Sequence, residues 1–240
     1  MRASLAALCC LGPEVRWARL KVLQIARGDD WSDKRRRELT FVRCSAVHVL
    51  GMMAAEDPSA VRTLVDLLDD TSAVDRLTAE SAANELASAD TEEVRFAVPR
   101  LIGCLDQAPR DDLSASYRTS IVSALGRLAQ GDESVRARLY SVIGEEEQGP
   151  MVRGTALTAL AMSILGDDPT SNSWRGRLRP VTDELGGHPD PYLKTMADQA
   201  HAQIERMNSM LKRRDESARL MAIDRSLNGR PRPASGAAGR

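Results

Sequence analysis

The chain has few of the residue types that build β-sheets, metal sites and disulfide frameworks. Only 3% of its 240 residues are aromatic, and none of its four cysteines forms a Cys-x-x-Cys pair. Few β-branched or aromatic runs alternate with a period of two, which argues against a sheet. We interpret Cys9, Cys10, Cys44 and Cys104 as thiols in a reducing cytoplasm rather than as zinc ligands or disulfide partners.

Long hydrophobic runs are also missing, and no apolar stretch has the length of a membrane span. The first residues, MRASLAALCCLG, weakly resemble a signal peptide. The apolar run is short, however, no small-x-small cleavage site follows it, and the helical pattern continues beyond it. We therefore favour a first amphipathic helix and expect a cytoplasmic protein that does not contact a membrane.

The familiar catalytic signatures do not occur. The sequence has no Gly-rich phosphate loop, no Gly-x-Ser-x-Gly and no His-Glu-x-x-His. His48, His188 and His201 are far apart, and the pair of Cys44 and His48 lies on an apolar helix, where core packing is the simpler role. We expect no catalytic residue, no metal and no cofactor.

Charge is unevenly distributed along the chain. The formal net charge is −1, yet residues 1–204 hold 24 basic and 30 acidic residues while residues 205–240 hold nine and four. Only four of the 33 basic residues are Lys. Because such an Arg bias often reflects genome composition, Arg abundance alone is poor evidence of a nucleic-acid site.

A short helical pattern is repeated along the chain. An Arg is followed three positions later by an apolar residue and seven positions later by Leu, which places all three on one helical face. The copies are Arg43, Ala46, Leu50; Arg118, Ile121, Leu125; and Arg153, Ala156, Leu160. The small residues Gly51, Gly126 and Ala161 follow the Leu, where they would allow a second helix to approach. The stretch LTAESAANELA (77–87) fits less well, since Ala79 replaces the Arg.

A polar turn and a second apolar helix follow each copy. The turns contain Asp, Ser, Thr or Pro, which are helix-stop and N-cap residues. Val-Arg opens the second helix three times, at Arg62, Arg95 and Arg136. PEVRWARLKVL (13–23) and RLRPVTDEL (177–185) have the same pattern, and Pro180 implies that the latter helix, or its last straight segment, starts at that residue.

The unit is therefore helix, turn, helix, with a period of about 35 to 44 residues. This repeat, in VRCSAVHVLG with AVRTLVDLL, EEVRFAVPRLIGCL, YRTSIVSALGRLAQGDESVR and MVRGTALTALA, resembles the HEAT-repeat family of armadillo-type proteins. The resemblance covers residues 42–185 and extends to 1–26 and 190–207. It implies an all-α, right-handed α-solenoid of about five helix pairs; an irregular helical bundle is the alternative.

Members of this family carry a ladder of Asp–Arg pairs between neighbouring turns. The resemblance therefore implies pairing of Arg62, Arg95 and Arg136 with the turn carboxylates, in place of a basic ligand-binding stripe.

The resemblance also suggests functions to compare. We expect a non-enzymatic scaffold or adaptor that binds another protein through its concave or edge surface. The alternative is a nucleic-acid-binding protein, including a repair enzyme similar to the alkylpurine DNA glycosylases, which would use Arg35–Arg37, Arg43 and the basic tail. The di-iron enzymes of the family need His-Glu motifs, which this chain lacks. No residue pattern favours the related phycobilin lyases.

Three stretches depart from the repeat and supply the candidate partner-binding residues. RGDDWSDKRRREL (27–39) contributes Trp31, Arg35, Arg36 and Arg37, although a loop and a solvated helical turn capped by Ser32 would also explain it. TSNSWRGRLRP (170–180) contributes Trp174, Arg175 and Arg177, because Trp and Arg are frequent interface anchors. Packing at the end of the last repeat is the favoured role of Trp174 itself.

The third departure is the C-terminal region. Residues 191–226 are predicted to form one long helix or two, with Met207 and Met210 on an apolar face that either closes the stack or meets a partner. The expected domains are a solenoid at 1–207, a helical extension at 208–227 and a flexible basic tail at 228–240.

Overall fold

The computed structural model describes residues 16–28, 30–54, 57–69, 75–89, 92–129, 131–165 and 169–228. Within these ranges the chain is helical and contains no strand, which confirms the all-α prediction. The α-helices are α2 (Arg16–Arg27), α3 (Asp33–Glu38), α4 (Thr40–Met53), α5 (Pro58–Leu67), α6 (Arg76–Ser88), α7 (Val98–Gln107), α8 (Ala115–Leu128), α9 (Glu133–Gly144), α10 (Gly149–Ser163), α11 (Pro169–Gly186) and α12 (Pro191–Asn228). Short 3₁₀ helices precede three of them: η1 (Glu92–Ala97), η2 (Asp112–Ser114) and η3 (Glu146–Gln148).

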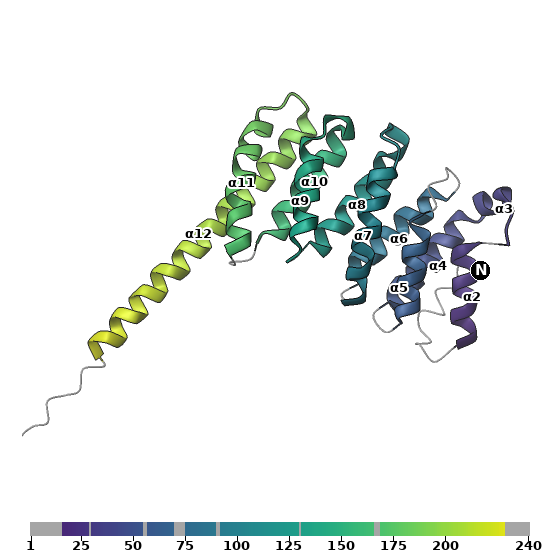
Figure 1. The fold of residues 1–240 in the computed structure, drawn as a ribbon, viewed down its shortest axis with the longest axis horizontal. Coiled ribbons are helices and arrows are strands. Elements are labelled where there is room, and N and C mark those ends of the chain that lie inside the picture. Colours follow the sequence, from purple (N-terminus) through teal and green to yellow (C-terminus); the bar gives the residue numbers. More distant parts are fainter. Residues whose placement is uncertain are drawn as a thin grey trace, which may run out of the picture.

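The helices form two layers along one axis (Figure 1). Layer A consists of α4, α6, α8, α10 and α12, and each of these contacts the next one in the series. Layer B consists of α2, α5, α7, α9 and α11, and these pack on the adjacent layer A helices. The helices thus contact mainly their near neighbours in the sequence. The predicted helix at residues 1–12 and the predicted tail after residue 228 lie outside the described residues.

The local signals act as the sequence predicts. Asp57 caps α5 by accepting a hydrogen bond from the Ser59 amide at 2.9 Å, and Asp132 caps α9 in the same way. Ser32 caps α3, as expected. Prolines stand in the first turns of α5 and α7, where no intrahelical amide donor is required.

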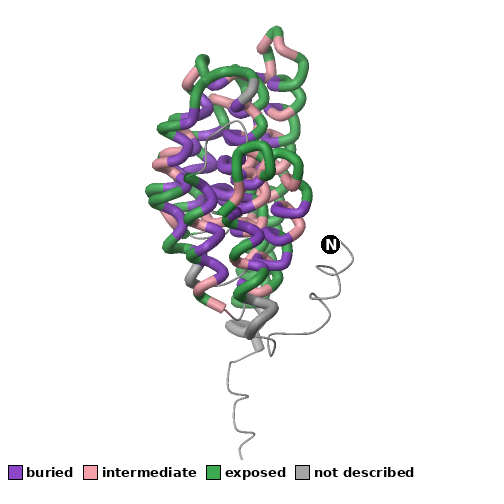
Figure 2. Tube along the Cα trace, turned by 90° about the vertical axis from the view of Figure 1, so that its right-hand side faces the viewer, coloured by how far each residue is buried: buried purple, intermediate pink, exposed green. Residues whose placement is uncertain are grey.

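The core lies between the layers and is built from aliphatic residues. The aligned apolar positions of the repeat, including Ala46, Leu50, Ile121 and Leu125, are fully buried. Seen end-on in Figure 2, the buried residues occupy the inner sides of the helices and the exposed residues the outer sides. The sequence-based assignment of the core face is therefore confirmed.

Close approach within layer A depends on small residues. A methyl group at Gly126 would overlap the Cβ of Ala159 on α10, and one at Gly51 would overlap Glu85 on α6. A methyl group at Gly154, which the repeat did not single out, would lie 2.8 Å from the Tyr192 ring. Glycine therefore sets how closely α4, α8 and α10 approach the next helix of the layer.

Layer B is instead joined by long charged side chains. Ion pairs link neighbouring helices about one repeat apart: Arg27 to Asp66 (3.1 Å), Arg100 to Asp69, and Arg138 to Asp106 (2.7 Å). The ion pairs found among the described residues do not include Arg62, Arg95 or Arg136; Asp90, one of the turn carboxylates, lies outside those residues, so the expected ladder stays a prediction. Arg100 and Arg138 reach back to the end of the preceding layer B helix, whereas Arg27, at the end of α2, reaches forward to the end of α5.

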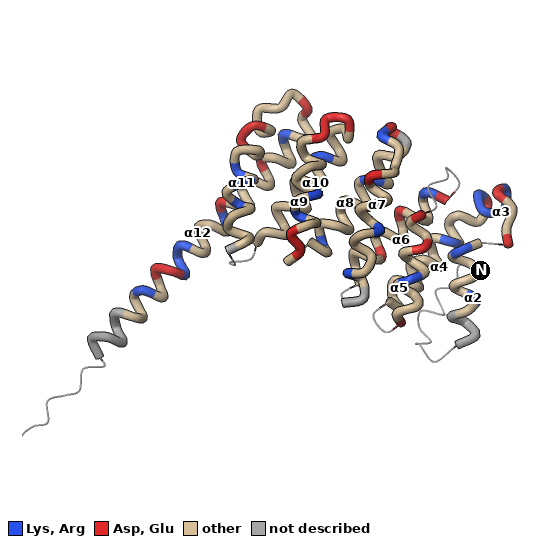
Figure 3. The backbone as a smooth tube through the Cα atoms, viewed as in Figure 1, with Lys and Arg blue, Asp and Glu red and all other residues tan. Residues whose placement is uncertain are grey.

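The end of the chain differs from its sequence-based description. TSNSWRGRLRP is not an insertion, because α11 begins at Pro169 and continues through Pro180. Residues 191–228 form one helix, so the boundary predicted at residue 208 falls inside a continuous element. Every residue of α12 from 212 to 222 is exposed, and this part of the helix projects past the other helices (Figure 1). It carries both positive and negative charges (Figure 3).

Candidate functional site

The repeated arginines stabilise helix ends. Arg43 donates from Nε to the carbonyl oxygen of Ala26 at 2.9 Å, at the C-terminus of α2, and Arg153 does the same for Ile143 of α9. Arg136 and Arg175 each donate at 2.8 Å to a carbonyl oxygen at the end of α10. A cationic donor satisfies carbonyls that lack an intrahelical partner and interacts favourably with the helix dipole. Arg43, Arg136, Arg153 and Arg175 are thus used internally, whereas Arg62 and Arg95 are exposed.

Arg43 is also neutralised by a buried acid. The Arg43 side chain is fully buried and forms an ion pair with Asp75, the residue just before α6, which is itself 2% exposed. Asp75 also accepts from Arg36 of α3 at 3.0 Å. Arg43 is therefore inaccessible to the nucleic-acid phosphates that the alternative function would require, and that expectation is wrong.

The first candidate cluster is only partly accessible. Trp31 is half-buried against the core, and its carbonyl oxygen accepts from Arg36 Nε at 3.2 Å. Arg36 therefore serves to anchor α3. Arg35 and Arg37 remain exposed.

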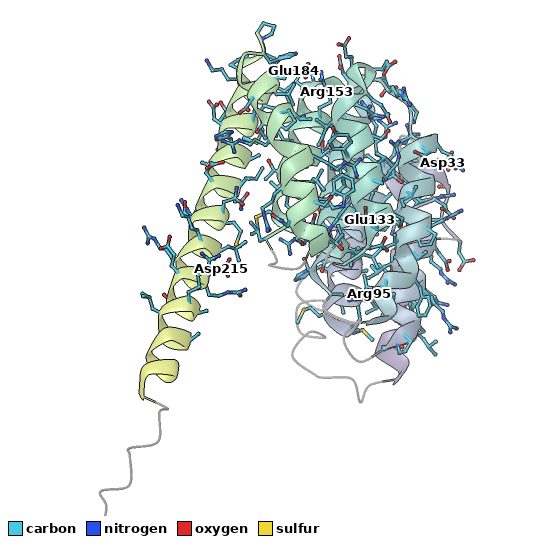
Figure 4. All side chains as sticks on the ribbon, turned by 60° about the vertical axis from the view of Figure 1, so that its left-hand side comes forward. Asp33, Arg95, Glu133, Arg153, Glu184 and Asp215 are labelled. Atoms are coloured by element: carbon cyan, nitrogen blue, oxygen red, sulfur yellow. The ribbon has the colours of Figure 1, made fainter. Side chains whose placement is uncertain are left out.

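The second cluster joins α9 to α11. Trp174 is 1% exposed and donates from Nε1 to Glu133 at 2.8 Å, while its ring packs on Tyr140. The Arg177 guanidinium lies 3.9 Å from the centre of the Trp174 ring. Figure 4 shows Glu133 at this inter-helix position. The packing role of Trp174 is confirmed. Its use as a partner contact is wrong, and that of Arg175 is wrong too, because both side chains are buried.

The methionine candidates lie where α12 leaves the other helices. Met207 is half-buried and Met210 is half-exposed. Asp215, labelled in Figure 4, lies further along the same helix. A groove lies between the start of α11 and this part of α12, and it is lined by polar and charged residues such as Asn172, Lys212 and Arg219.

A larger surface feature emerges only from the packing. In each layer A helix, four residues on the side away from layer B reach solvent, and they follow one another at spacings of four, three and four positions. We call these twenty positions the layer A face. They are Phe41, Ser45, His48, Met52; Leu77, Ser81, Asn84, Ser88; Ser116, Ser120, Ser123, Arg127; Met151, Thr155, Thr158, Met162; and Tyr192, Met196, Gln199, Gln203. All twenty are exposed or half-buried.

Side-chain contacts at this face link α4, α6 and α8, and separately α10 and α12. His48 meets Glu85 at 2.9 Å, and Ser116 donates to Glu80 at 3.1 Å, which joins α4, α6 and α8. Thr158 and Met196 are in contact between α10 and α12. The prediction that His48 packs in the core is wrong: its side chain is 64% exposed.

The twenty positions of the layer A face carry little formal charge, although the Glu85 and Glu80 carboxylates contact His48 and Ser116 there. Charged residues make up 28% of the chain, so about six of twenty surface positions would carry charge if it were evenly spread. Arg127 is the single Lys, Arg, Asp or Glu among the twenty. Layer B, with its Arg–carboxylate pairs, has the opposite character.

Most hydroxyl groups on the face are satisfied internally. They donate to the carbonyl oxygen four residues earlier in the same helix at 2.8–3.1 Å, which leaves a surface with little unmet hydrogen-bonding demand. The residues concerned are Ser45, Ser81, Ser88, Thr155 and Thr158. Covering such a surface costs less desolvation than covering ionised groups.

A polar network borders the face where α8 and α10 begin. Glu145 accepts from Arg138 at 2.6 Å, Ser141 at 2.9 Å and Gln148 at 2.8 Å. Burial raises the pKa of Glu145, but these hydrogen bonds and the charge of Arg138 outweigh burial and lower it to about 2. Gln148 in turn accepts from the buried Arg118 at 2.7 Å. Burial lowers the pKa of Arg118.

No cluster of three or more His, Cys, Asp or Glu suited to a metal ion occurs among the described residues. Cys104 is buried, and burial raises the pKa of its thiol. Cys9 and Cys10 lie outside the described residues. No described helix has the length and apolar character needed to cross a membrane.

Comparison of the chain with models of protein families, with curated proteins and with solved structures yields no significant match.

Proposed function

We propose that this chain is a right-handed α-solenoid of HEAT-like helix pairs that binds another protein on its layer A face. It would act as a scaffold or adaptor. The repeating helix pairs, the contacts between sequence neighbours and the glycines at close approaches support the solenoid arrangement.

The observation that carries the binding proposal is the composition of the layer A face. Interface cores are depleted in Lys, Glu and Asp and enriched in Met and aromatic residues. The face holds four Met, one Phe and one Tyr, and it contains no Lys, Asp or Glu. Its twenty positions also fall within the usual size of one side of a stable interface, about 20–30 residues.

The distribution of apolar residues suggests where affinity is concentrated. Phe41, Met52 and Leu77 stand at one end of the face, and Met151 and Tyr192 at the other; each is at least 41% exposed. Small hydroxyl residues of α8 occupy the middle. Apolar residues at both ends and small uncharged residues at the centre would fit an elongated partner that lies across the helices and makes its main apolar contacts at the two ends.

The test places negative charge at the centre of the face. Ser120 and Ser123 are half-buried, uncharged and at the middle of α8. The double variant Ser120→Glu/Ser123→Glu should lose a stoichiometric partner captured from the native host. The matched control, Gln107→Glu/Ala137→Glu, changes exposed positions of layer B and should retain it. Retention by both variants would refute binding on the layer A face.

A further inference from the structure

Arg118 is a buried arginine that forms no ion pair with an acid among the described residues. Asp75, which neutralises Arg43, directly precedes α6, the next layer A helix. The equivalent residue for Arg118 of α8 directly precedes α10, and it is the neutral Gln148. In the helix that lacks the Arg, where Ala79 takes its place, the residue before the next layer A helix is Ser114.

The surroundings of Arg118 leave its charge incompletely compensated. Its side chain is 2% exposed and donates to Gln148 at 2.7 Å and to the carbonyl oxygen of Asp111 at 3.2 Å. Its Nε is buried without a hydrogen-bond partner, and no carboxylate among the described residues lies within ion-pair distance of it. A buried charge is costly unless it is paired, and an unfilled donor on it adds to that cost.

Arg118 lines a groove at the edge of the layer A face. The groove is also formed by Ala115, Pro150, Met151 and Tyr192, which are mostly apolar, and by Gln148. An anion that enters it would lie near the positive charge of Arg118 and against hydrocarbon.

Three acidic residues near the groove repel an anion, but their repulsion is weakened by ion pairing, hydrogen bonding or exposure to solvent. Glu147 lines the groove, but it is 68% exposed and pairs with Arg110 at 3.6 Å. The Asp111 carboxylate is engaged with the Ser114 amide at 2.7 Å. Asp112, also at the groove, is exposed to solvent, where its charge is screened.

We propose that this groove binds the C-terminal carboxylate of a protein chain, attracted by the charge of the Arg118 guanidinium that lines it. A chain end carries its carboxylate and an apolar side chain on the same carbon atom, so both reach the groove together. An Asp or Glu side chain brings no such apolar neighbour. The inference deepens the proposed function, since it names the group by which a protein partner is anchored beside the layer A face.

The probe is N-acetyl-leucine, which represents a chain end, titrated into the full chain with ¹⁵N-labelled arginine. The Arg118 Nε–H signal should shift saturably. N-acetyl-leucinamide, without the charge, and N-acetyl-aspartic acid α-amide, with a side-chain carboxylate, should shift it at least tenfold more weakly. Equal response to the amide, or no saturable response to N-acetyl-leucine, overturns the proposal; equal response to the aspartic acid derivative overturns the assignment to a chain end.

Gln148→Glu supplies the missing acid internally and should abolish the response, whereas Gln107→Glu, the same change at an exposed position, should preserve it. Met151→Asp offers a second test at an exposed residue of the groove, and at least tenfold weaker binding is expected. Response retained in both groove variants overturns the proposal. Binding of these small probes does not require the protein partner. The proposal for the groove can therefore be refuted while the proposal of partner binding on the layer A face stands, and the reverse.

Discussion

Replacing Gly126 by Ala tests whether glycine sets the spacing of layer A. In a helix interior, Ala is intrinsically more stable than Gly by about 0.5–1 kcal/mol. At Gly126, however, the new methyl group would overlap the Cβ of Ala159 and lie 3.0 Å from its Cα. The neighbouring atom is part of a rigid helix, so α8 and α10 must separate, and overpacking of this kind costs about 1–3 kcal/mol.

The net expectation is a loss of up to about 2.5 kcal/mol in the free energy of unfolding, which for a chain of this size lowers Tm by up to about 10 °C. The matched control is Gly103→Ala in α7, where an added methyl group meets nothing within 4 Å. That variant should gain about 0.5–1 kcal/mol. Urea and thermal unfolding followed by circular dichroism measure both. If Gly126→Ala is stabilised as Gly103→Ala is, the close approach does not depend on glycine.

Three further predictions concern charge. Asp75→Asn leaves Arg43 buried without its acid and should destabilise the fold by about 3–5 kcal/mol in urea denaturation; a cost below 1 kcal/mol would contradict the importance of the pair. Glu145 has a folded pKa of about 2, below its ordinary 4.5, so its contribution is present above pH 4.5 and is lost as the pH falls toward 2. That contribution is at most about 3 kcal/mol, and Glu145→Gln should lose less stability than the parent chain between pH 7 and pH 3. Because Arg35 and Arg37 are the exposed members of their cluster, duplex DNA should bind weakly even at low salt; tight binding that falls steeply with salt would instead support the nucleic-acid alternative.

The repeated pattern of Arg, apolar residue and Leu was sufficient to predict the helices and their buried faces. Helical periodicity is local: residues three, four and seven apart share a face whatever the neighbouring helix is. The caps at Asp57 and Asp132 were predictable for the same reason, because a cap bonds to amides two or three residues away.

The candidate site was much less predictable. Trp174 and Arg175 have the residue types of interface anchors, but exposure depends on packing, and α11 packs on α9 and α12 so that both are buried. The layer A face did leave a signal in the sequence, since its serine, threonine and methionine positions recur at a constant offset from the repeat. That signal acquires meaning only once α4 to α12 are known to lie in one layer.

The sequence by itself determined that this protein is helical, which residues form its core and where most of its helices begin, because those properties arise from contacts within a few residues. Tertiary structure decided which arginines are buried, that layer B is joined by ion pairs, and that Arg118 lines a groove without a matching acid. These depend on residues about 30 to 40 positions apart, whose proximity is set by how one helix pair stacks on the next.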